Sequence, residues 1–221
     1  MLSKKKTLER IEEIAKLYPN ASVELHFETT FQLLIAVILS AQTTDVAVNK
    51  ATPALFAAYP DAFALAKADE KEVMEKIKTI GLYRNKAKNI IACSQQLVAE
   101  FNGEVPHTMK ELTSLAGVGR KTANVVLSVA FDIPAFAVDT HIERVAKRLY
   151  IVSEKANVRE VEEKITASVP KEMWNKLHHQ MIFFGRYFCT AKKPKCDECP
   201  FTQECRVGKK YLKQQNNSTD L

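Results

Sequence analysis

Four cysteines lie close together near the end of the chain, and no other feature limits its folding as strongly. They follow the spacing C-x6-C-x2-C-x5-C, at Cys189, Cys196, Cys199 and Cys205. The residues between them include lysines and acidic side chains, which do not form an apolar core. No secretory signal is visible, so we expect a cytoplasmic protein, in which disulfides are rare. Four thiols this close therefore predict a metal site that folds the segment into a closed loop.

The spacing leaves the identity of the metal open between zinc and iron. Structural zinc sites usually pair their ligands in two tight C-x2–4-C knuckles, and only Cys196 and Cys199 make such a pair. The wider arms suit a larger object, such as a [4Fe–4S] cube held by four thiolates. Spacing therefore favours iron–sulfur over zinc. Cys93 stands apart and is interpreted as a small buried apolar residue.

The rest of the chain is patterned for helices. Glycine is scarce, with 6 among 221 residues, while good helix formers are frequent. Pro53 is expected to kink or split a helix running from Asp45 toward Ala58, and the polar end 214–221 is expected to fray. We predict an all-α protein with a domain boundary near Pro134. Apolar residues recur at helical spacing in segments 4–17, 30–41, 84–101 and 171–187.

Charge and hydropathy limit the partners. The formal net charge of +6 is consistent with a polyanion such as nucleic acid, although an ordinary basic protein explains it nearly as well. The most apolar run, residues 31–39, is too short to span a bilayer. We therefore expect no membrane partner.

The segment Gly117-Val118-Gly119 separates two expected helices. The first would begin at Thr108, which can form a capping box with Glu111. Two glycines let the backbone approach a phosphate, and the N–H groups that open the next helix form an anion site. With Val118 packed inward, this is the layout of a helix–hairpin–helix that binds the DNA backbone. The alternative is a simple tight turn.

Two residues near this hairpin are candidates for chemistry. Lys121 falls in the first turn of the second helix, where the helix dipole, and burial if it occurs, favour a neutral, nucleophilic amine. The alternative is a plain phosphate contact. A capping box between Thr140 and Glu143 would leave Asp139 free, whereas in the alternative Asp139 is itself the N-cap. His141 is a candidate for either a DNA contact or a structural hydrogen bond.

The loop between Cys189 and Cys196 is basic. A bound cluster would hold Lys192, Lys193 and Lys195 on its rim as a surface for phosphate contacts. A solvated lysine run is the alternative.

Taken together, these motifs resemble the endonuclease III family of DNA glycosylase/AP lyases, within the helix–hairpin–helix superfamily. The resemblance extends over residues 5–210. One departure is Ala116, where the family usually has proline, and this substitution would loosen the end of the first hairpin helix. The resemblance rests on the four clustered cysteines and on segments 39–45 (LSAQTTD), 80–83 (IGLY), 117–123 (GVGRKTA) and 138–141 (VDTH).

The resemblance implies two helical domains with a DNA-binding cleft between them. Residues 22–133 would form a six-helix barrel with the hairpin at about 108–130. Residues 1–21 and 134–221 would form a domain with a [4Fe–4S] cluster in loop 189–205. The expected protein is a monomer associated with the nucleoid.

The resemblance also implies an activity: base excision repair of double-stranded DNA. Oxidised pyrimidines would be removed by base flipping, followed by a lysine Schiff base and β-elimination 3′ to the abasic site. Lys121 and Asp139 match the catalytic residues, and Gln42 and Leu82 match residues that enter the duplex. The remaining expected DNA contacts are Gly117, Val118, Gly119, Arg120, Thr122, His141, Lys192 and Lys193.

Three rival interpretations remain. The adenine-excising branch of the superfamily usually lacks the lysine and carries an extra C-terminal domain. A non-catalytic DNA-binding module would keep the hairpin but leave an abasic duplex intact. An electron carrier would use the cluster but leave the hairpin and Lys121 unexplained.

Overall fold

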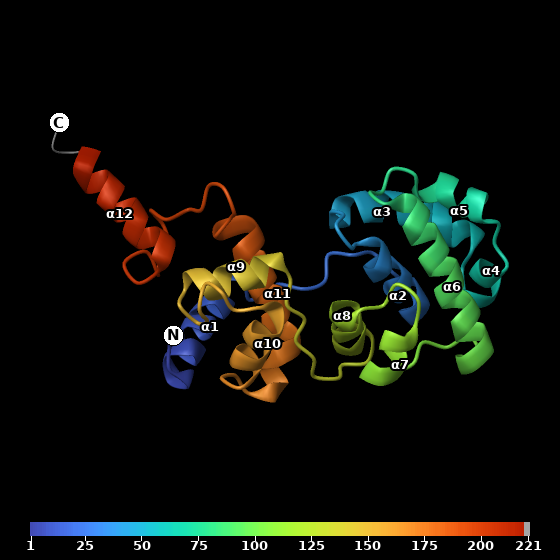
Figure 1. Ribbon diagram of the computed structural model, residues 1–221, viewed down its shortest axis with the longest axis horizontal. Helices are drawn as coiled ribbons and strands as arrows, with labels where there is room; N and C mark the ends of the chain where they lie inside the picture. The colour runs from blue at the N-terminus through green and yellow to red at the C-terminus, as the bar shows by residue number, and fades with distance from the viewer. Residues whose placement is uncertain (219–221) are drawn as a thin grey trace. The chain divides into compact units, whose positions relative to one another are not determined.

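A computed structural model describes residues 1–218, with side chains described through residue 216. The described residues form α-helices, one 3-10 turn and one π-helical turn, with no strand among them (Figure 1). They divide into two compact units, Val23–Ala135 and the combination of Met1–Ser22 with Phe136–Leu221. The prediction of an all-α chain with two helical domains is confirmed.

The unit Val23–Ala135 is built around α2 (Thr30–Leu39), in which residues 31–39 are all buried. The other helices of this unit are α3 (Asp45–Ala58), α4 (Ala62–Ala66), α5 (Glu70–Ile77), α6 (Tyr83–Phe101), α7 (Met109–Ser114) and α8 (Arg120–Ala130). Helix α2 packs against α3, α6 and α8, and α6 packs against α4 and α5 (Figure 1). Within the described part of the chain, no helix is long and apolar enough to cross a membrane.

Side-chain caps explain where several of these helices begin. Asp61 and Asp69 accept hydrogen bonds from backbone N–H groups in the first turns of α4 and α5, as N-cap residues do. Thr108 caps α7 through the Glu111 N–H group at 3.2 Å. The Glu111 carboxylate accepts from the Thr108 hydroxyl, so only half of the predicted capping box forms. Pro53 does not split α3, which continues to Ala58.

The second unit brings both ends of the chain into one core. Its helices are α1 (Lys4–Leu17), α9 (Thr140–Arg148), α10 (Val158–Thr166), α11 (Trp174–Phe183) and α12 (Arg206–Ser218). Helix α11 packs against α1 and α9. Its buried Leu177 and Met181 share a core with Ile11 and Ile14 of α1, so the N-terminal helix is held by residues from the far end of the sequence.

One expectation for the C-terminal region is wrong in detail. Residues 171–187 are not one helix but a 3-10 turn (Lys171–Met173), α11 and a π-helical turn (Phe184–Phe188). The Cys189 N–H group donates to the Phe184 carbonyl at 2.7 Å and closes this wide turn. Residues 214–218 belong to α12, and their fraying stays a prediction; the rest of that expected segment lies outside the described residues.

Candidate functional site

The turn between α7 and α8 is shaped by Gly117. Its φ is +77°, and an added Cβ would lie 3.0 Å from the Asn89 Cβ and 3.2 Å from the Ile38 Cγ2. Glycine is therefore required for conformation and for space. Val118 is only 6% exposed, so it packs inward as predicted and fixes the turn.

The N-terminus of α8 is open. Gly119 is its N-cap and makes no side-chain capping bond, and a Cβ added at Gly119 would meet nothing within 4 Å. Its first turn contains no acidic residue. Uncapped N–H groups and the positive end of the helix dipole attract anions, and phosphate is the usual one.

The turn is also held from the side by α6. The Ala116 N–H group donates to the Gln96 Oε1 at 2.7 Å, and the Gln96 Nε2 donates to the Ser114 carbonyl at 3.2 Å. Alanine at this position supplies an N–H group that proline lacks, and Gln96 accepts it, while the loosening itself stays a prediction. Nothing in the sequence of α6 identifies this contact.

Lys121 is the second residue of α8 and is exposed. The Lys121 side chain is therefore not buried, so burial does not favour its neutral amine. Its location in the first turn of α8 is as predicted. Among the described residues, no carboxylate pairs with its ammonium group. Lys121 is thus accessible for either of its two proposed roles, nucleophile or phosphate contact.

Asp139 is the N-cap of α9. Its Oδ1 accepts from the His141 N–H group at 2.9 Å and the Ile142 N–H group at 2.8 Å. Of the two alternatives left open by the sequence, the structure therefore shows Asp139 as the N-cap, and the Glu143 carboxylate accepts from the Lys147 Nζ at 2.5 Å. Asp139 Oδ2 makes no hydrogen bond within the described chain. The cap therefore orients the carboxylate while leaving one oxygen available.

His141 contacts its own unit closely. Its Nδ1 lies 3.3 Å from the Arg144 Nη2, and a Cβ added at Gly185 would approach the His141 Cβ to 2.8 Å. These contacts favour the structural alternative for His141, and the DNA contact remains a prediction.

Gln42 and Leu82 lie on two loops that meet, although they are far apart in the sequence. A Cβ added at Gly81 would be 3.8 Å from both the Gln42 carbonyl oxygen and the Thr43 Oγ1. Both residues are exposed and both have left-handed backbones, with φ of 54° and 59°. Such strain in non-glycine residues concentrates at functional sites, and the sequence gives no sign of it.

The four clustered cysteines line one cavity. The Gly208 N–H group donates to the Cys205 Sγ at 3.0 Å, and the Arg148 Nη1 donates to the Cys189 Sγ at 3.2 Å. Four thiols are the donor set that holds a [4Fe–4S] cube, so the residues present fit that group.

Cysteine binds either iron or zinc as a thiolate. Burial raises the pKa of the Cys196 and Cys199 thiols, so positive charge is needed to hold them as thiolates. Burial also raises the pKa of Cys93 to about 12, which agrees with its interpretation as an inert apolar residue.

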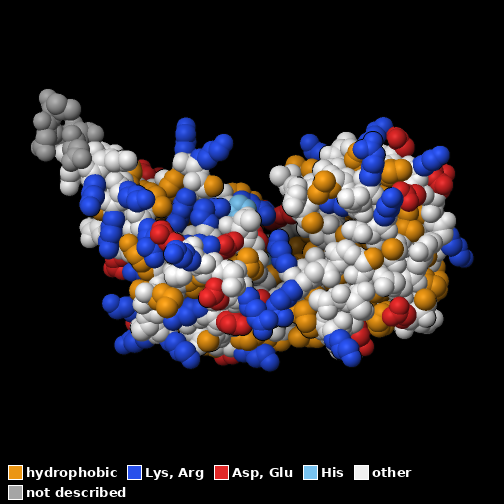
Figure 2. Space-filling view, in the orientation of Figure 1, with side chains coloured by type: hydrophobic (Ala, Val, Ile, Leu, Met, Phe, Trp, Pro, Cys, Tyr) orange, Lys and Arg blue, Asp and Glu red, His pale blue; other side chains and the backbone are white. Residues whose placement is uncertain are grey.

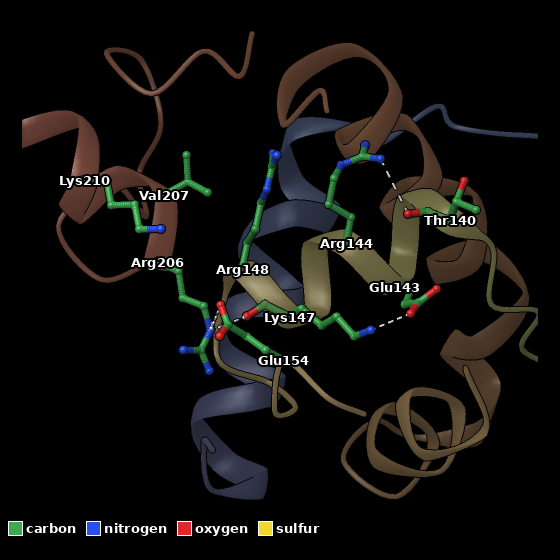
Figure 3. Close-up of a pocket in the computed structure, with 9 residues that line it drawn as sticks. All are labelled: Thr140, Glu143, Arg144, Lys147, Arg148, Glu154, Arg206, Val207 and Lys210. Carbon is green, nitrogen blue, oxygen red and sulfur yellow. Dashed lines mark hydrogen bonds and ion pairs between the residues drawn. The ribbon is translucent and has the colours of Figure 1, made fainter. Parts of the chain in front are cut away.

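Two arginines of α9 fasten the cysteine loop. Arg144 donates to the Gly185 carbonyl at 2.6 Å, and Arg148 donates to the Thr190 and Ala191 carbonyls at 2.7 and 3.0 Å. Burial and the neighbouring Arg148 lower the pKa of Arg144. Both side chains border a pocket of about 440 Å³ that Lys210 of α12 also lines (Figure 3). Neither arginine stands out in the sequence as an anchor.

The cysteine loop held by these two arginines carries exposed cations. Lys192 and Lys193 are exposed, and no ion pair of either appears within the described residues. Lysine and arginine side chains cover much of the visible face of this unit (Figure 2). The loop can therefore offer charge to a polyanion.

Comparisons with known proteins agree on one family. Residues 35–171 match the HhH-GPD superfamily of base excision DNA repair proteins, and residues 189–205 match the iron–sulfur binding domain of endonuclease III. Endonuclease III of Bacillus subtilis is 50% identical over 90% of this chain and 91% of its own. Endonuclease III of Escherichia coli is 46% identical over 95% and 99%.

Solved structures are similar over the same extent. One is a trapped endonuclease III–DNA covalent intermediate, with a TM-score of 0.93 at 50% identity, covering 96% of this chain and 100% of the other. A thermostable thymine-DNA glycosylase has a TM-score of 0.83 at 26% identity, covering 93% and 98%.

Proposed function

Since this chain belongs to the endonuclease III family, we propose that Lys121 is the nucleophile with which it works as a DNA glycosylase/AP lyase in base excision repair. The observation that carries this assignment is the exposed lysine in the first turn of an uncapped α8, directly after the Gly117–Gly119 turn. We propose that the damaged bases it removes are oxidised pyrimidines. We also propose that it acts at the nucleoid, in the cytoplasm.

Duplex DNA binds through its phosphates. The open N-terminus of α8 accepts a phosphate at Gly117, Val118 and Gly119, with Arg120 and Thr122 beside it. Because these contacts are to the backbone, the hairpin holds DNA of any sequence. Recognition of the lesion must come from elsewhere.

The damaged nucleotide is flipped out, because its C1′ cannot be reached inside the stack. Unstacking costs a few kcal/mol, less for a damaged base. Gln42 and Leu82 offset this by filling the gap. Their exposure on two adjoining loops suits that role.

The chemistry then proceeds at C1′. The Lys121 amine forms a bond to C1′ as the glycosidic bond breaks, and the base leaves with that electron pair and takes up a proton. Asp139, as a carboxylate, accepts a proton from Lys121 and stabilises positive charge on the sugar. The nitrogen lone pair then forms a C1′=N bond as the C1′–O4′ bond breaks, and O4′ takes up a proton. The resulting Schiff base acidifies the 2′ hydrogen. Loss of that proton forms a C=C bond and expels the 3′ phosphate, which breaks the strand.

The chain carries a [4Fe–4S] cluster, and we assign its four ligands to Cys189, Cys196, Cys199 and Cys205. When bound, the cluster supplies structure and charge, with no redox step at the lesion. It shapes the loop that holds Lys192 and Lys193 against the phosphates.

The direct test is incubation with duplexes that contain thymine glycol or an abasic site, with and without borohydride. We expect strand cleavage and, with borohydride, a covalent protein–DNA adduct, because hydride reduces a Schiff base to a stable amine. Intact duplexes and no adduct would leave only a DNA-binding module. A visible absorbance scan separates the coloured iron–sulfur cluster from colourless zinc.

We expect replacement of Lys192 and Lys193 by alanine to weaken DNA binding and flatten its salt dependence. The slope of log K against log salt should fall by about 2, because each phosphate contact contributes about 0.9. The measurement is a salt titration by fluorescence anisotropy. The control replaces Lys155 and Lys171, which are exposed on the same unit, and an equal fall there would mean that only net charge matters.

Gln96→Leu should weaken binding of an abasic-site duplex by about threefold to tenfold, because it removes two hydrogen bonds of about 1 kcal/mol each that hold the hairpin turn. Gln95→Leu is the matched control, since Gln95 donates to the Ala66 carbonyl at 3.2 Å, away from the hairpin. Equal DNA binding by the two variants would show that the Gln96 hydrogen bonds to the hairpin turn do not contribute to DNA binding.

A further inference from the structure

Lys86 is an anomaly that the proposed mechanism does not use. It lies in α6 and is only 4% exposed. A buried ammonium group is normally paired with a carboxylate, yet within the described chain Lys86 has no ion pair. Among the described residues, the partner of its side chain is the Thr43 hydroxyl, which accepts from the Lys86 Nζ at 2.6 Å.

The surroundings of Lys86 make its charge unfavourable. It lies near the N-terminus of α6, whose first turn has no acidic residue, so the helix dipole disfavours a cation there. Burial lowers the pKa of Lys86. A residue that carries these penalties without an ion pair contributes something other than stability.

The contacts of Lys86 indicate what that contribution is. Its backbone N–H group donates to the Leu82 carbonyl at 3.1 Å, while its side chain bonds to Thr43, the neighbour of Gln42. One residue therefore touches both of the loops that carry Gln42 and Leu82. Both of those residues have left-handed backbones, and such conformations persist only where neighbouring contacts hold them.

We propose that Lys86 is a positioning residue that holds Gln42 and Leu82 at the spacing needed to enter the duplex. This inference rests on the proposed function, since it acts through the two residues assigned to fill the gap. Lys86 touches neither the substrate nor Lys121. Its charge-assisted bond to Thr43 fixes the first loop, and its place in α6 fixes the second.

The test is a double-mutant cycle on cleavage of an abasic-site duplex at single turnover. Lys86→Met keeps the aliphatic stem and removes the donor, and Gln42→Ala removes the inserted side chain. Each should slow cleavage by about tenfold. The double variant should be slowed by about the same tenfold, because both changes remove one function. A hundredfold loss in the double variant would show independent effects and overturn the proposal.

Three further variants keep the result interpretable. Thr43→Val removes the acceptor of the same hydrogen bond and should slow cleavage as much as Lys86→Met does. This variant tests the proposal even if Lys86→Met fails to fold. Thr43→Ser keeps the hydroxyl and should retain wild-type cleavage. Lys88→Met removes an exposed charge from the same helix and should also be neutral.

The outcomes separate this inference from the proposed function. If the wild-type protein neither cleaves nor is trapped on abasic duplexes, the proposed function fails. If it is active and Lys86→Met and Thr43→Val both keep full rates, only the positioning role fails. A fluorescent 2-aminopurine placed opposite the abasic site should report reduced local opening in Lys86→Met and unchanged opening in Lys88→Met.

Discussion

Lys121→Gln is expected to abolish the borohydride-trapped adduct and to slow strand cleavage by about a thousandfold or more. Glutamine has no amine to form a Schiff base, and loss of a covalent nucleophile is among the largest single-residue effects on rate. The measurement is trapping and single-turnover cleavage on an abasic duplex. Because Lys121 is exposed, its replacement should leave the fold unchanged.

Two controls separate the nucleophile from a phosphate contact. Lys121→Arg keeps a positive charge but cannot form the Schiff base, so it should bind DNA and still fail to trap. Lys110→Gln removes an exposed charge from the first hairpin helix and should trap normally. An adduct of wild-type yield with Lys121→Gln would mean that another amine is the nucleophile.

Asp139→Asn is expected to slow single-turnover cleavage by about a hundredfold, the size typical of losing a general base or a stabilising charge. DNA binding should be spared. Asparagine is as good an N-cap as aspartate, so α9 should keep its start, and the variant isolates the charge from the structural role. Thermal unfolding checks that separation.

Asp139→Ala provides the comparison, since it removes the cap as well and should lower stability by about 1 kcal/mol. If Asp139→Asn cleaves at the wild-type rate, the carboxylate is only a helix cap.

The sequence predicted the helix positions of the two candidate reactive groups more reliably than it predicted their surroundings. Lys121 could be placed in a first helical turn because two glycines mark where α8 starts. The role of Asp139 as N-cap was left open, because Thr140 and Glu143 offer an equally good local pattern. In the structure the Glu143 carboxylate pairs with Lys147, so it does not bond to the start of α9. Capping rules that consider only the residues at a helix start do not include Lys147 as a competing partner.

Tertiary contacts account for what the sequence could not predict. Gln96, Lys86 and Arg148 look like ordinary polar residues on amphipathic helices, and their partners are distant in the chain. The acceptor of the Ala116 N–H group could not be predicted for the same reason, since Gln96 lies on α6. Helical periodicity predicts which face is buried, but not which polar group meets another across it.

The wide turn at Phe184–Phe188 has a consequence for how this chain tolerates change in length. Successive residues of an α-helix are rotated by about 100°. A turn that contains one extra residue therefore changes the direction in which the next side chain points. Cys189 leaves the turn in that altered direction. A variant of this chain shortened by one residue in this stretch would point Cys189, the first proposed cluster ligand, away from the other three, so we expect the deletion to impair cluster binding.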